Sequence, residues 1–151
     1  MTTNRRTEIV DLLIEELKKI NGEPSTFNAS YIYNNNLFNN VYRGVKFLDE
    51  VNDFPALYLA AGTEIRNFES LSLTVATLDV TIRAYVYGED NSQSLADDLL
   101  EDIEHVIYSL EDSPTKGIQD ITIESITVDE GLVEPYGLAE VSIQVTYRLE
   151  N

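Results

Sequence analysis

The sequence predicts an α+β fold, with a mainly antiparallel sheet of four to five strands and two helices packed on one face. Two observations lead to this prediction. Two segments repeat apolar residues at spacings of three and four, as amphipathic helices do, and several others alternate apolar and polar residues, as half-buried strands do. With only two helices and mostly hairpin connections, neighbouring strands should run antiparallel and both helices should cover the apolar face.

The first expected helix spans residues 3–20. Its apolar residues lie on one stripe, which consists of Ile9, Val10, Leu13, Ile14, Leu17 and Ile20. Asn21 and Gly22 should end the helix, because glycine tolerates the left-handed conformation of a helix C-terminus. Arg5 and Arg6 lie at the end where the helix dipole disfavours positive charge. Either a solvated terminus or a contact with an acidic neighbouring subunit would explain them.

Residues 22–40 are predicted to form a flexible loop. The segment is rich in Asn and Ser, which favour turns, and it is long for a compact domain. Its aromatic residues, together with one just beyond it, supply the kind of surface that partner interfaces use: Tyr31, Tyr33, Phe38 and Tyr42. The alternative, in which these side chains fold back over the sheet, is equally compatible with the sequence.

Three strand-like segments follow this loop, a weak one at residues 42–47, a second at 56–61 and the strongest at 70–87. The alternation of the third segment changes parity near Ala76 and Thr77, which predicts a bulge, because a slip of one residue exchanges the two faces of a strand. At about 3.3 Å per residue this segment would extend roughly 55 Å, against a domain diameter of roughly 40 Å. It must therefore bend, break or project as a hairpin arm toward a neighbouring subunit.

Residues 91–112 form the second expected helix, in the most acidic part of the chain. Together with the two residues before it, this segment contains nine acidic residues and no Lys or Arg. Its apolar stripe consists of Leu95, Leu99, Ile103, Val106 and Leu110. This stripe should turn three acidic residues to water, namely Asp98, Glu101 and Asp102. Ser113 and Pro114 should end the helix.

The last two strands are expected to form a hairpin. Residues 121–128 and 141–149 alternate apolar and polar side chains on either side of a turn at 130–137. The parity of the first of these strands shifts at Ser125. All of these elements fit one domain that spans residues 1–151.

Composition excludes several classes of protein. The chain has 27 acidic and 10 basic residues and a net charge of -17, which repels the phosphate backbones that non-specific nucleic-acid binders attract. It has no cysteine, which excludes disulfides, zinc–thiolate sites and thiol nucleophiles. The N-terminal segment lacks the uncharged apolar core of a signal peptide, and no apolar run is long enough to cross a bilayer.

No group of side chains predicts a catalytic centre, a metal site or a cofactor site. His105, the only histidine, and Glu101 have a spacing that could share a metal ion, but such sites need matching ligands from other helices. An exposed helix pair is the preferred interpretation. Glu101 and Asp102 should share one aqueous environment, whereas acid–base catalysis needs two different ones. Because phosphate-binding glycine loops, EF-hands and Gly-x-Ser-x-Gly motifs are also missing from the sequence, we do not expect an enzyme.

The order of elements resembles that of the tail terminator, or tail-completion, proteins of long-tailed bacteriophages, including the lambda type. The resemblance covers nearly the whole chain, although this family has no diagnostic active-site motif. It rests on the amphipathic N-terminal helix that ends in Lys18-Lys19-Ile20-Asn21, the strand Phe54-Pro55-Ala56-Leu57, the long strand that ends in residues 78–88, and the helical segment 95–104.

The resemblance implies a small subunit that forms a homo-oligomeric, hexameric ring on the finished tail tube and ends tube polymerisation. Its partners would be the tail tube protein and the head-completion (connector) protein, and its location the virion tail, after assembly in the host cytoplasm. DNA would pass through the ring without specific binding, helped by repulsion from an acidic wall. No membrane would be involved.

Two sets of residues follow as candidates for the ring. Acidic residues in loops could face the lumen, namely Glu64, Glu69, Asp129, Glu130 and Glu134. Arginines could contact acidic neighbouring subunits, namely Arg43, Arg66, Arg83 and Arg148. Because the large net charge opposes self-assembly, such a ring would also need apolar or sheet-edge contacts.

Two alternatives stay open at this point. One is a tail tube or head–tail joining subunit of the same particle, and the other is a small acidic binding module or small hydrolase that acts alone. The state of assembly separates them, because tube subunits form long stacks, a terminator stops at one ring, and a stand-alone module stays monomeric.

Overall fold

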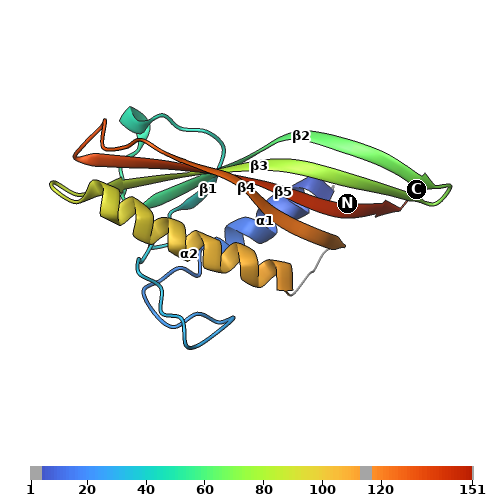
Figure 1. Cartoon of the computed structure of the whole chain (residues 1–151), viewed down its shortest axis with the longest axis horizontal. Helices are drawn as coiled ribbons and strands as arrows, with labels where there is room; N and C mark the ends of the chain where they lie inside the picture. The colour runs from blue at the N-terminus through green and yellow to red at the C-terminus, as the bar shows by residue number, and fades with distance from the viewer. Residues whose placement is uncertain (1–4, 113–116, 151) are drawn as a thin grey trace.

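The computed structural model describes residues 5–112 and 117–150, and within them it shows a five-stranded sheet with two α-helices on one face (Figure 1). The α+β prediction is confirmed. The helices are α1 (Arg5–Leu17) and α2 (Ser92–Asp112), and a short 3-10 helix, η1 (Leu48–Glu50), precedes the second strand. The strands are β1 (Val41–Arg43), β2 (Ala56–Ser70), β3 (Leu73–Tyr87), β4 (Ile118–Val128) and β5 (Tyr136–Glu150).

The sheet has the strand order β1-β2-β3-β5-β4. All neighbours run antiparallel except β1, which pairs in parallel with β2 over only 3 residues. β3 and β5 form the centre and pair in unbroken register from Leu73 opposite Glu150 to Tyr87 opposite Tyr136. The long central pair therefore sets the length of the molecule.

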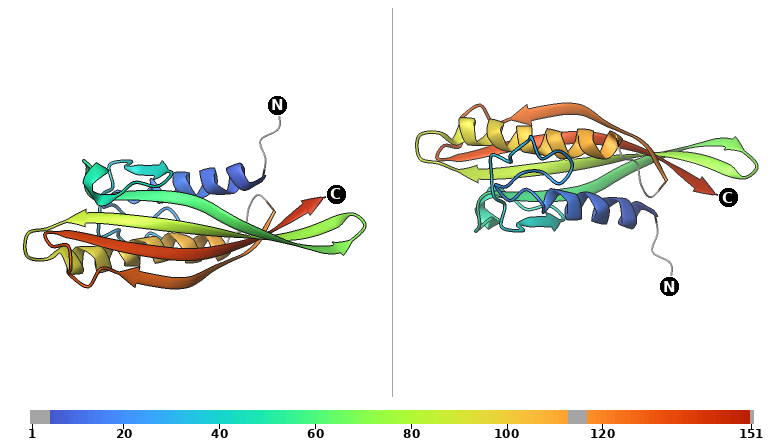
Figure 2. Two further views of the ribbon diagram at one scale, coloured as in Figure 1. Left: turned by 90° about the horizontal axis from the view of Figure 1, so that it is seen from above. Right: turned by 90° about the horizontal axis from the view of Figure 1, so that it is seen from below.

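Both helices lie on the same face of the sheet, with α1 over β1 and β2 and α2 over β3, β4 and β5 (Figure 2). Every second residue of β3 from Ala76 to Val86 is buried on that face. The intervening residues of β3 are mostly polar and half-buried, and they form the opposite, helix-free face with their partners on β5. Alternation along the strand thus separates a core face from an open face.

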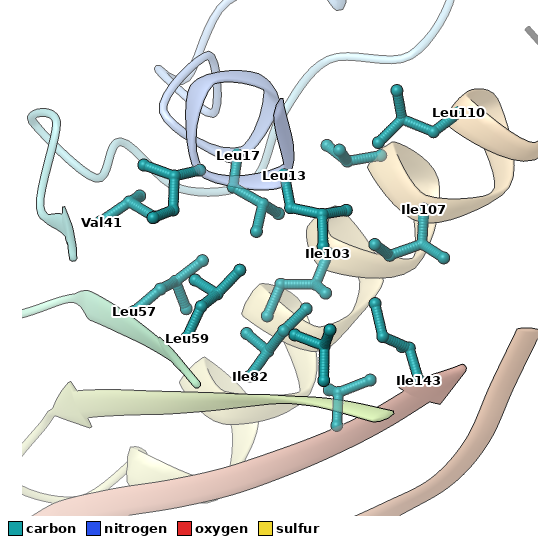
Figure 3. Packing of buried hydrophobic residues seen from close by; sticks show 14 of the residues in the cluster. Leu13, Leu17, Val41, Leu57, Leu59, Ile82, Ile103, Ile107, Leu110 and Ile143 are labelled. Carbon is teal, nitrogen blue, oxygen red and sulfur yellow. The ribbon is translucent and has the colours of Figure 1, made fainter. Parts of the chain in front are cut away.

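The core fills the space between the helices and the sheet (Figure 3). It is aliphatic and joins the two helices to the sheet through Leu13 and Leu17 of α1, Ile103, Ile107 and Leu110 of α2, and Val41, Leu57, Leu59, Ile82 and Ile143 of the strands. A smaller cluster on the other face contains Val51, Ala56, Tyr58 and Tyr85, with Leu48 of η1 packed against it.

The helix boundaries differ slightly from the sequence prediction. α1 ends at Leu17, and a turn follows in which the Ile20 N–H donates to the Leu17 carbonyl. Gly22 has a φ of 79°, as a left-handed position requires. Residues 3–4, expected in the first helix, and residues 113–114, expected to end the second, lie outside the described residues.

The largest departure from the prediction is the length of β2. This strand does not end at residue 61 but continues to Ser70, and Leu71 and Ser72 then turn the chain into β3. Register shifts between Ala61 and Glu64 and between Phe68 and Ser70 interrupt its pairing with β3. These irregularities, and the absence of a covering helix, remove the apolar alternation on which the prediction depended.

The predicted bulges have different outcomes. The parity shift at Ser125 is confirmed as a register shift between Ile123 and Ser125 of β4. The bulge predicted at Ala76 and Thr77 is wrong, because β3 pairs there with β5 without a shift. The parity of β3 changes because the residues before Ala76 lie beyond the helices, where no buried face dictates which side is apolar.

Candidate assembly surface

Beyond the helices, β2 and β3 continue as a projecting hairpin, which we call the arm (residues 65–75). Figures 1 and 2 show that neither helix reaches it on either face. The last residues of β5 pair with the β3 side of the arm, from Ala76 opposite Tyr147 to Leu73 opposite Glu150. The arm is therefore a continuous extension of the sheet. The long strand was expected to bend, break or project, and it projects.

The arm exposes large apolar side chains. Ile65 is 59% exposed, Phe68 69% and Leu71, at the tip, 92%. Ile65 pairs with Thr77 and Phe68 with Thr74, and since paired residues share a face, the two apolar side chains lie on opposite faces. Burial of a large apolar side chain contributes about 1.5–3 kcal/mol. An arm that leaves several of them uncovered is typical of a surface that another protein covers.

Glu64, one of the candidate lumen residues, braces the base of the arm. Its side chain is only 5% exposed, and it accepts hydrogen bonds from the Tyr147 hydroxyl and from Arg66 Nε, the latter at 2.6 Å. Burial alone would raise the pKa of Glu64, but these two donors outweigh burial and lower it. The carboxylate of Glu64 thus interacts with Tyr147 and Arg66 of its own chain.

The other four lumen candidates lie at both ends of the sheet. Glu69 is exposed near the tip of the arm, whereas Asp129, Glu130 and Glu134 lie in the β4–β5 turn at the far end (Figure 1). Asp129 accepts the backbone N–H of Leu138 at 3.1 Å, so it organises that turn. Glu130 and Glu134 are exposed. The structure therefore divides the candidates into two groups that do not meet within one chain.

The loop over residues 22–40 packs against α2. Asp102 of α2 is fully buried and accepts hydrogen bonds from the Tyr31 hydroxyl at 2.8 Å, the Asn34 N–H at 2.9 Å and the Asn35 N–H at 3.0 Å. The prediction that Asp102 faces water is wrong. The helical stripe correctly placed it away from the sheet, but the loop covers that part of the helix.

His105 belongs to the same contact. Its ring stacks on Tyr31, with centroids 4.0 Å apart and an interplanar angle of 6°, and its Nε2 lies 2.7 Å from Ser25 Oγ. Burial lowers the pKa of His105, which favours the neutral ring. The predicted exposed pair with Glu101 is therefore wrong. No group of three His, Cys, Asp or Glu residues converges on a metal position within residues 5–112 and 117–150.

The four aromatic candidates separate into two pairs. Tyr31 is half-buried and Tyr33 is 3% exposed, and both contact His105 of α2. Phe38 is 72% exposed and Tyr42 41% exposed. Folding back therefore describes Tyr31 and Tyr33, although onto a helix and not onto the sheet, while Phe38 and Tyr42 are placed where a partner could reach them.

Three of the four candidate arginines have carboxylate partners within the described chain. Their ion pairs are Arg43–Asp11 at 2.7 Å, Arg66–Glu64 at 2.6 Å and Arg83–Glu140 at 3.0 Å. Arg43–Asp11 is exposed on both sides, and such a pair contributes at most about 1 kcal/mol, whereas the carboxylate of Glu64 is buried. The side chains of Arg43 and Arg66 remain 45% and 59% exposed, so both are accessible to a neighbouring subunit, as is Arg148.

An apolar cavity lies at the end of the sheet opposite the arm, and we call it the end cavity. It has a volume of about 450 Å³ and is lined by Asn35, Phe54, Pro55, Val86, Tyr87 and Leu95. Tyr87 packs against Phe54 and Tyr136, with ring centroids 6.3 and 5.2 Å apart. The sequence did not predict this cavity, because its walls come from two loops, the end of β3 and α2. The aromatic residues at the strand ends were the available signal.

The sequence is similar to that of known bacteriophage tail proteins. The model of the family described as the bacteriophage tail tube terminator protein matches residues 3–151. The chain is 29% identical over 158 residues to the tail tube terminator protein p142 of Escherichia phage T5, and the match covers 96% of this chain and 94% of that protein. Among solved structures, a chain from the virion of a native gene transfer agent particle is similar with a TM-score of 0.48 and 11% identity, over 74% of this chain and 79% of that chain.

Within the described residues, no helix is long and apolar enough to cross a membrane. The predicted family resemblance is confirmed by a match that spans almost the entire sequence. The chain belongs to the tail tube terminator proteins of bacteriophages and is a structural protein of the virion tail.

Proposed function

We propose that copies of this chain form a closed ring on the end of the finished tail tube, stop the addition of tube subunits and present a surface to the head-completion protein. The arm carries this proposal, because Ile65, Phe68 and Leu71 are exposed on a hairpin that no described part of the chain covers. A ring requires each subunit to offer a surface that fits the next one. The arm is an apolar surface that reaches beyond its own subunit.

The proposed ring is hexameric, as in the family that the sequence resembles. Each subunit has a net charge of -17, so neighbouring subunits repel one another through their general surface. Contacts that close the ring must therefore bury apolar area, and the arm supplies it. Phe38 and Tyr42 remain candidates for contacts with the tube or the head-completion protein.

We further propose that DNA passes the ring without being held. The helix-free face of the sheet supports this, because it carries the acid Asp79, neutral polar residues and the ion pair Arg83–Glu140, which balances its own charge. Such a face offers few cationic contacts to DNA phosphates. The exposed acids Glu69, Glu130 and Glu134 are the remaining candidates for repulsion from the lumen wall.

A capping role needs no catalysis, and we propose that the chain is not an enzyme. The buried polar cluster that could suggest chemistry, formed by Ser25, Tyr31, Asp102 and His105, is occupied in holding the loop to α2.

The test is the length of tails made in infected cells. Phage that lacks this chain should produce overlong tubes without heads, and supplying the wild-type chain should restore tails of uniform length that join heads. The double variant F68E/L71E should not restore them, because it places two charges on the apolar arm. The control Ile32→Glu changes a side chain that is 61% exposed in the loop over residues 22–40, and it should restore normal tails.

Uniform, head-joined tails with F68E/L71E would contradict the role of the arm. Electron microscopy of the purified chain addresses the alternative function, because spontaneous growth into long tubes would identify a tube subunit and not a terminator.

A further inference from the structure

We infer that the end cavity receives the tip of the arm of a second copy of this chain, so that subunits join head to tail. This inference rests on the proposed ring and assigns the surface that the arm meets. It also names the side chains involved, with Leu71 and Phe68 as the inserted residues and Phe54, Tyr87 and Leu95 as the receiving ones.

The two surfaces lie where a head-to-tail contact needs them. The tip of the arm and the turns that surround the end cavity occupy opposite ends of the long axis of the sheet (Figures 1 and 2). A chain cannot insert its own arm into a cavity at its other end, so both surfaces stay open in the monomer. Contacts between unlike surfaces repeat from subunit to subunit, and they close into a ring when the rotation per subunit allows it.

The chemistry of the two surfaces matches. Leu71 is 92% and Phe68 69% exposed, and the end cavity of about 450 Å³ is lined mainly by apolar and aromatic side chains. Tyr87, on its wall, is 45% exposed and thus accessible. Aromatic rings favour edge-to-face contacts with a further ring, so Phe68 is a suitable neighbour for the group that Tyr87 forms with Phe54 and Tyr136.

The charges of the two ends favour this orientation. The Gly88 N–H donates to the Pro135 carbonyl at 2.9 Å, so the turns that contain Glu89, Asp90 and Glu134 lie side by side at the cavity end. The sequence has no Lys or Arg in residues 84–115 or 117–147. Two cavity ends would therefore repel each other.

The arm end is closer to electrical balance, because the exposed Arg66 and Arg148 lie at its base with Glu64, while Glu69 lies near its tip. An acidic cavity end thus meets an end with accessible guanidinium groups. The charges therefore favour contact between an arm end and a cavity end over contact between two cavity ends.

A second cavity is a poorer acceptor. It has a volume of about 270 Å³, lies beside Phe47 and Tyr85, and is partly lined by Lys46, Arg83 and Glu140. Insertion of Leu71 there would place an apolar side chain against charged groups that need water. This cavity serves as a comparison in the experiment.

Cysteine trapping tests the inference, because the chain has no cysteine of its own. Chains that carry Leu71→Cys are mixed with chains that carry Tyr87→Cys, and in a second mixture with chains that carry Leu95→Cys. The chains are oxidised after incorporation into isolated tails. The expected result is a disulfide-linked pair at twice the mass of the chain in these mixtures. A doubly substituted L71C/Y87C chain should give a ladder of larger species, because each subunit then carries both partners.

Three outcomes overturn the inference. A disulfide between Leu71→Cys and Phe47→Cys, without one to the end cavity, assigns the arm to the smaller cavity. Efficient pairing of Leu71→Cys with itself shows that arms meet arms. The third outcome is the absence of a disulfide from Leu71→Cys to either Tyr87→Cys or Leu95→Cys in tails of normal length. This outcome would not contradict the proposed capping function. By contrast, overlong tails even with the wild-type chain would contradict the proposed function itself.

Discussion

The carboxylate of Asp102 lies 2.8 Å from the hydroxyl of Tyr31, although 71 residues separate the two in the sequence. The same carboxylate accepts the backbone N–H groups of Asn34 and Asn35 and the side-chain amide of Asn35, the last at 3.2 Å. An ionised carboxylate offers about four acceptor positions. One buried acid therefore satisfies several donors of a loop and holds that loop against α2.

Replacement of Asp102 by alanine should release this loop from α2. The N–H groups of Asn34, which is exposed, and Asn35, which is half-buried, would lose their acceptors, and each lost hydrogen bond costs about 0.5–1.5 kcal/mol. We expect faster hydrogen exchange at both amides and a lower free energy of unfolding in urea. Asp98→Ala, which removes an exposed acid one turn earlier on α2, is the control and should change neither. Unchanged exchange in Asp102→Ala would show that other contacts hold the loop.

The stability that Asp102 contributes should depend on pH in a defined direction. Burial raises the pKa of Asp102, although its hydrogen-bond donors partly oppose this. A carboxyl group with a raised pKa binds a proton more readily in the folded state, so its contribution is largest below its ordinary pKa of about 3.9. The contribution is lost as the pH rises through the raised value.

The other acidic residues contribute equally to the stability of the wild-type chain and of Asp102→Asn. The difference in unfolding free energy between the two chains therefore reports Asp102 alone, and it should fall as the pH rises above about 4. The opposite slope would mean that the donors outweigh burial and that the carboxylate is the favoured form.

The location of Asp102 also shows what the sequence could and could not predict. Both helices and the β4–β5 hairpin were predicted, because their apolar spacing is a local property of the chain. The burial of Asp102 was not, since the residues that cover it lie about 70 positions earlier and the helical pattern reports only which side faces the sheet. For the same reason, nothing in α2 itself revealed that His105 stacks on Tyr31.

The arm was only partly predictable. The length of the strand that ends at Tyr87 indicated that it bends, breaks or projects, but the partner strand beyond residue 61 was missed. A strand alternates apolar and polar residues when one of its faces is buried. Along the arm neither face is covered by a helix, so the pattern has no physical cause there. The end cavity was missed because it forms only when four distant segments meet.

His105 provides a spectroscopic measure of loop docking, because it is the only histidine in the chain. Burial lowers its pKa from the ordinary 6.5, although the charge of Asp102 partly opposes this. In an NMR titration the ring should therefore become protonated below pH 6.5. The folded state should lose stability as the pH falls through the lowered value.

Tyr31→Ala removes the stacked ring from His105 and should raise its titration midpoint toward 6.5. Tyr42→Ala is the control, because Tyr42 contacts Tyr58 and not His105. A midpoint at or above 6.5 in the wild-type chain would contradict the buried, stacked position of the ring.

The brace between Glu64 and Tyr147 should stabilise the base of the arm. Tyr147→Phe removes the hydroxyl that donates to Glu64, and a hydrogen bond to a charged group contributes about 1.5–3 kcal/mol. The lowered pKa of Glu64 means that this stabilisation is present above its ordinary pKa and is lost as the pH falls through the lowered value.

The wild-type chain should therefore be more stable than Tyr147→Phe at neutral pH, and the difference should shrink on acidification. Thermal unfolding followed by circular dichroism measures both quantities. Tyr108→Phe, which alters a tyrosine that is 50% exposed on α2, is the control and should have little effect at any pH. Equal stability of Tyr147→Phe and the wild-type chain at pH 7 would show that the hydrogen bond between Tyr147 and Glu64 does not stabilise the fold.

Self-association should strengthen with salt. Each chain has a net charge of -17, and the repulsion between chains extends about 30 Å at 0.01 M ionic strength but only about 3 Å at 1 M. Salt also weakens the attraction between the acidic cavity end and the accessible arginines, but with a net charge of -17 on each chain the repulsion is the larger charge effect. Burial of Leu71 and Phe68 does not depend on screening, so added salt favours assembly. Light scattering coupled to size exclusion at these two salt concentrations should show a larger share of oligomer at the higher one. F68E/L71E should stay monomeric in both, because it lacks the apolar contact. Dissociation of the wild-type oligomer by salt would instead mean that ion pairs such as those of Arg66 hold the subunits together.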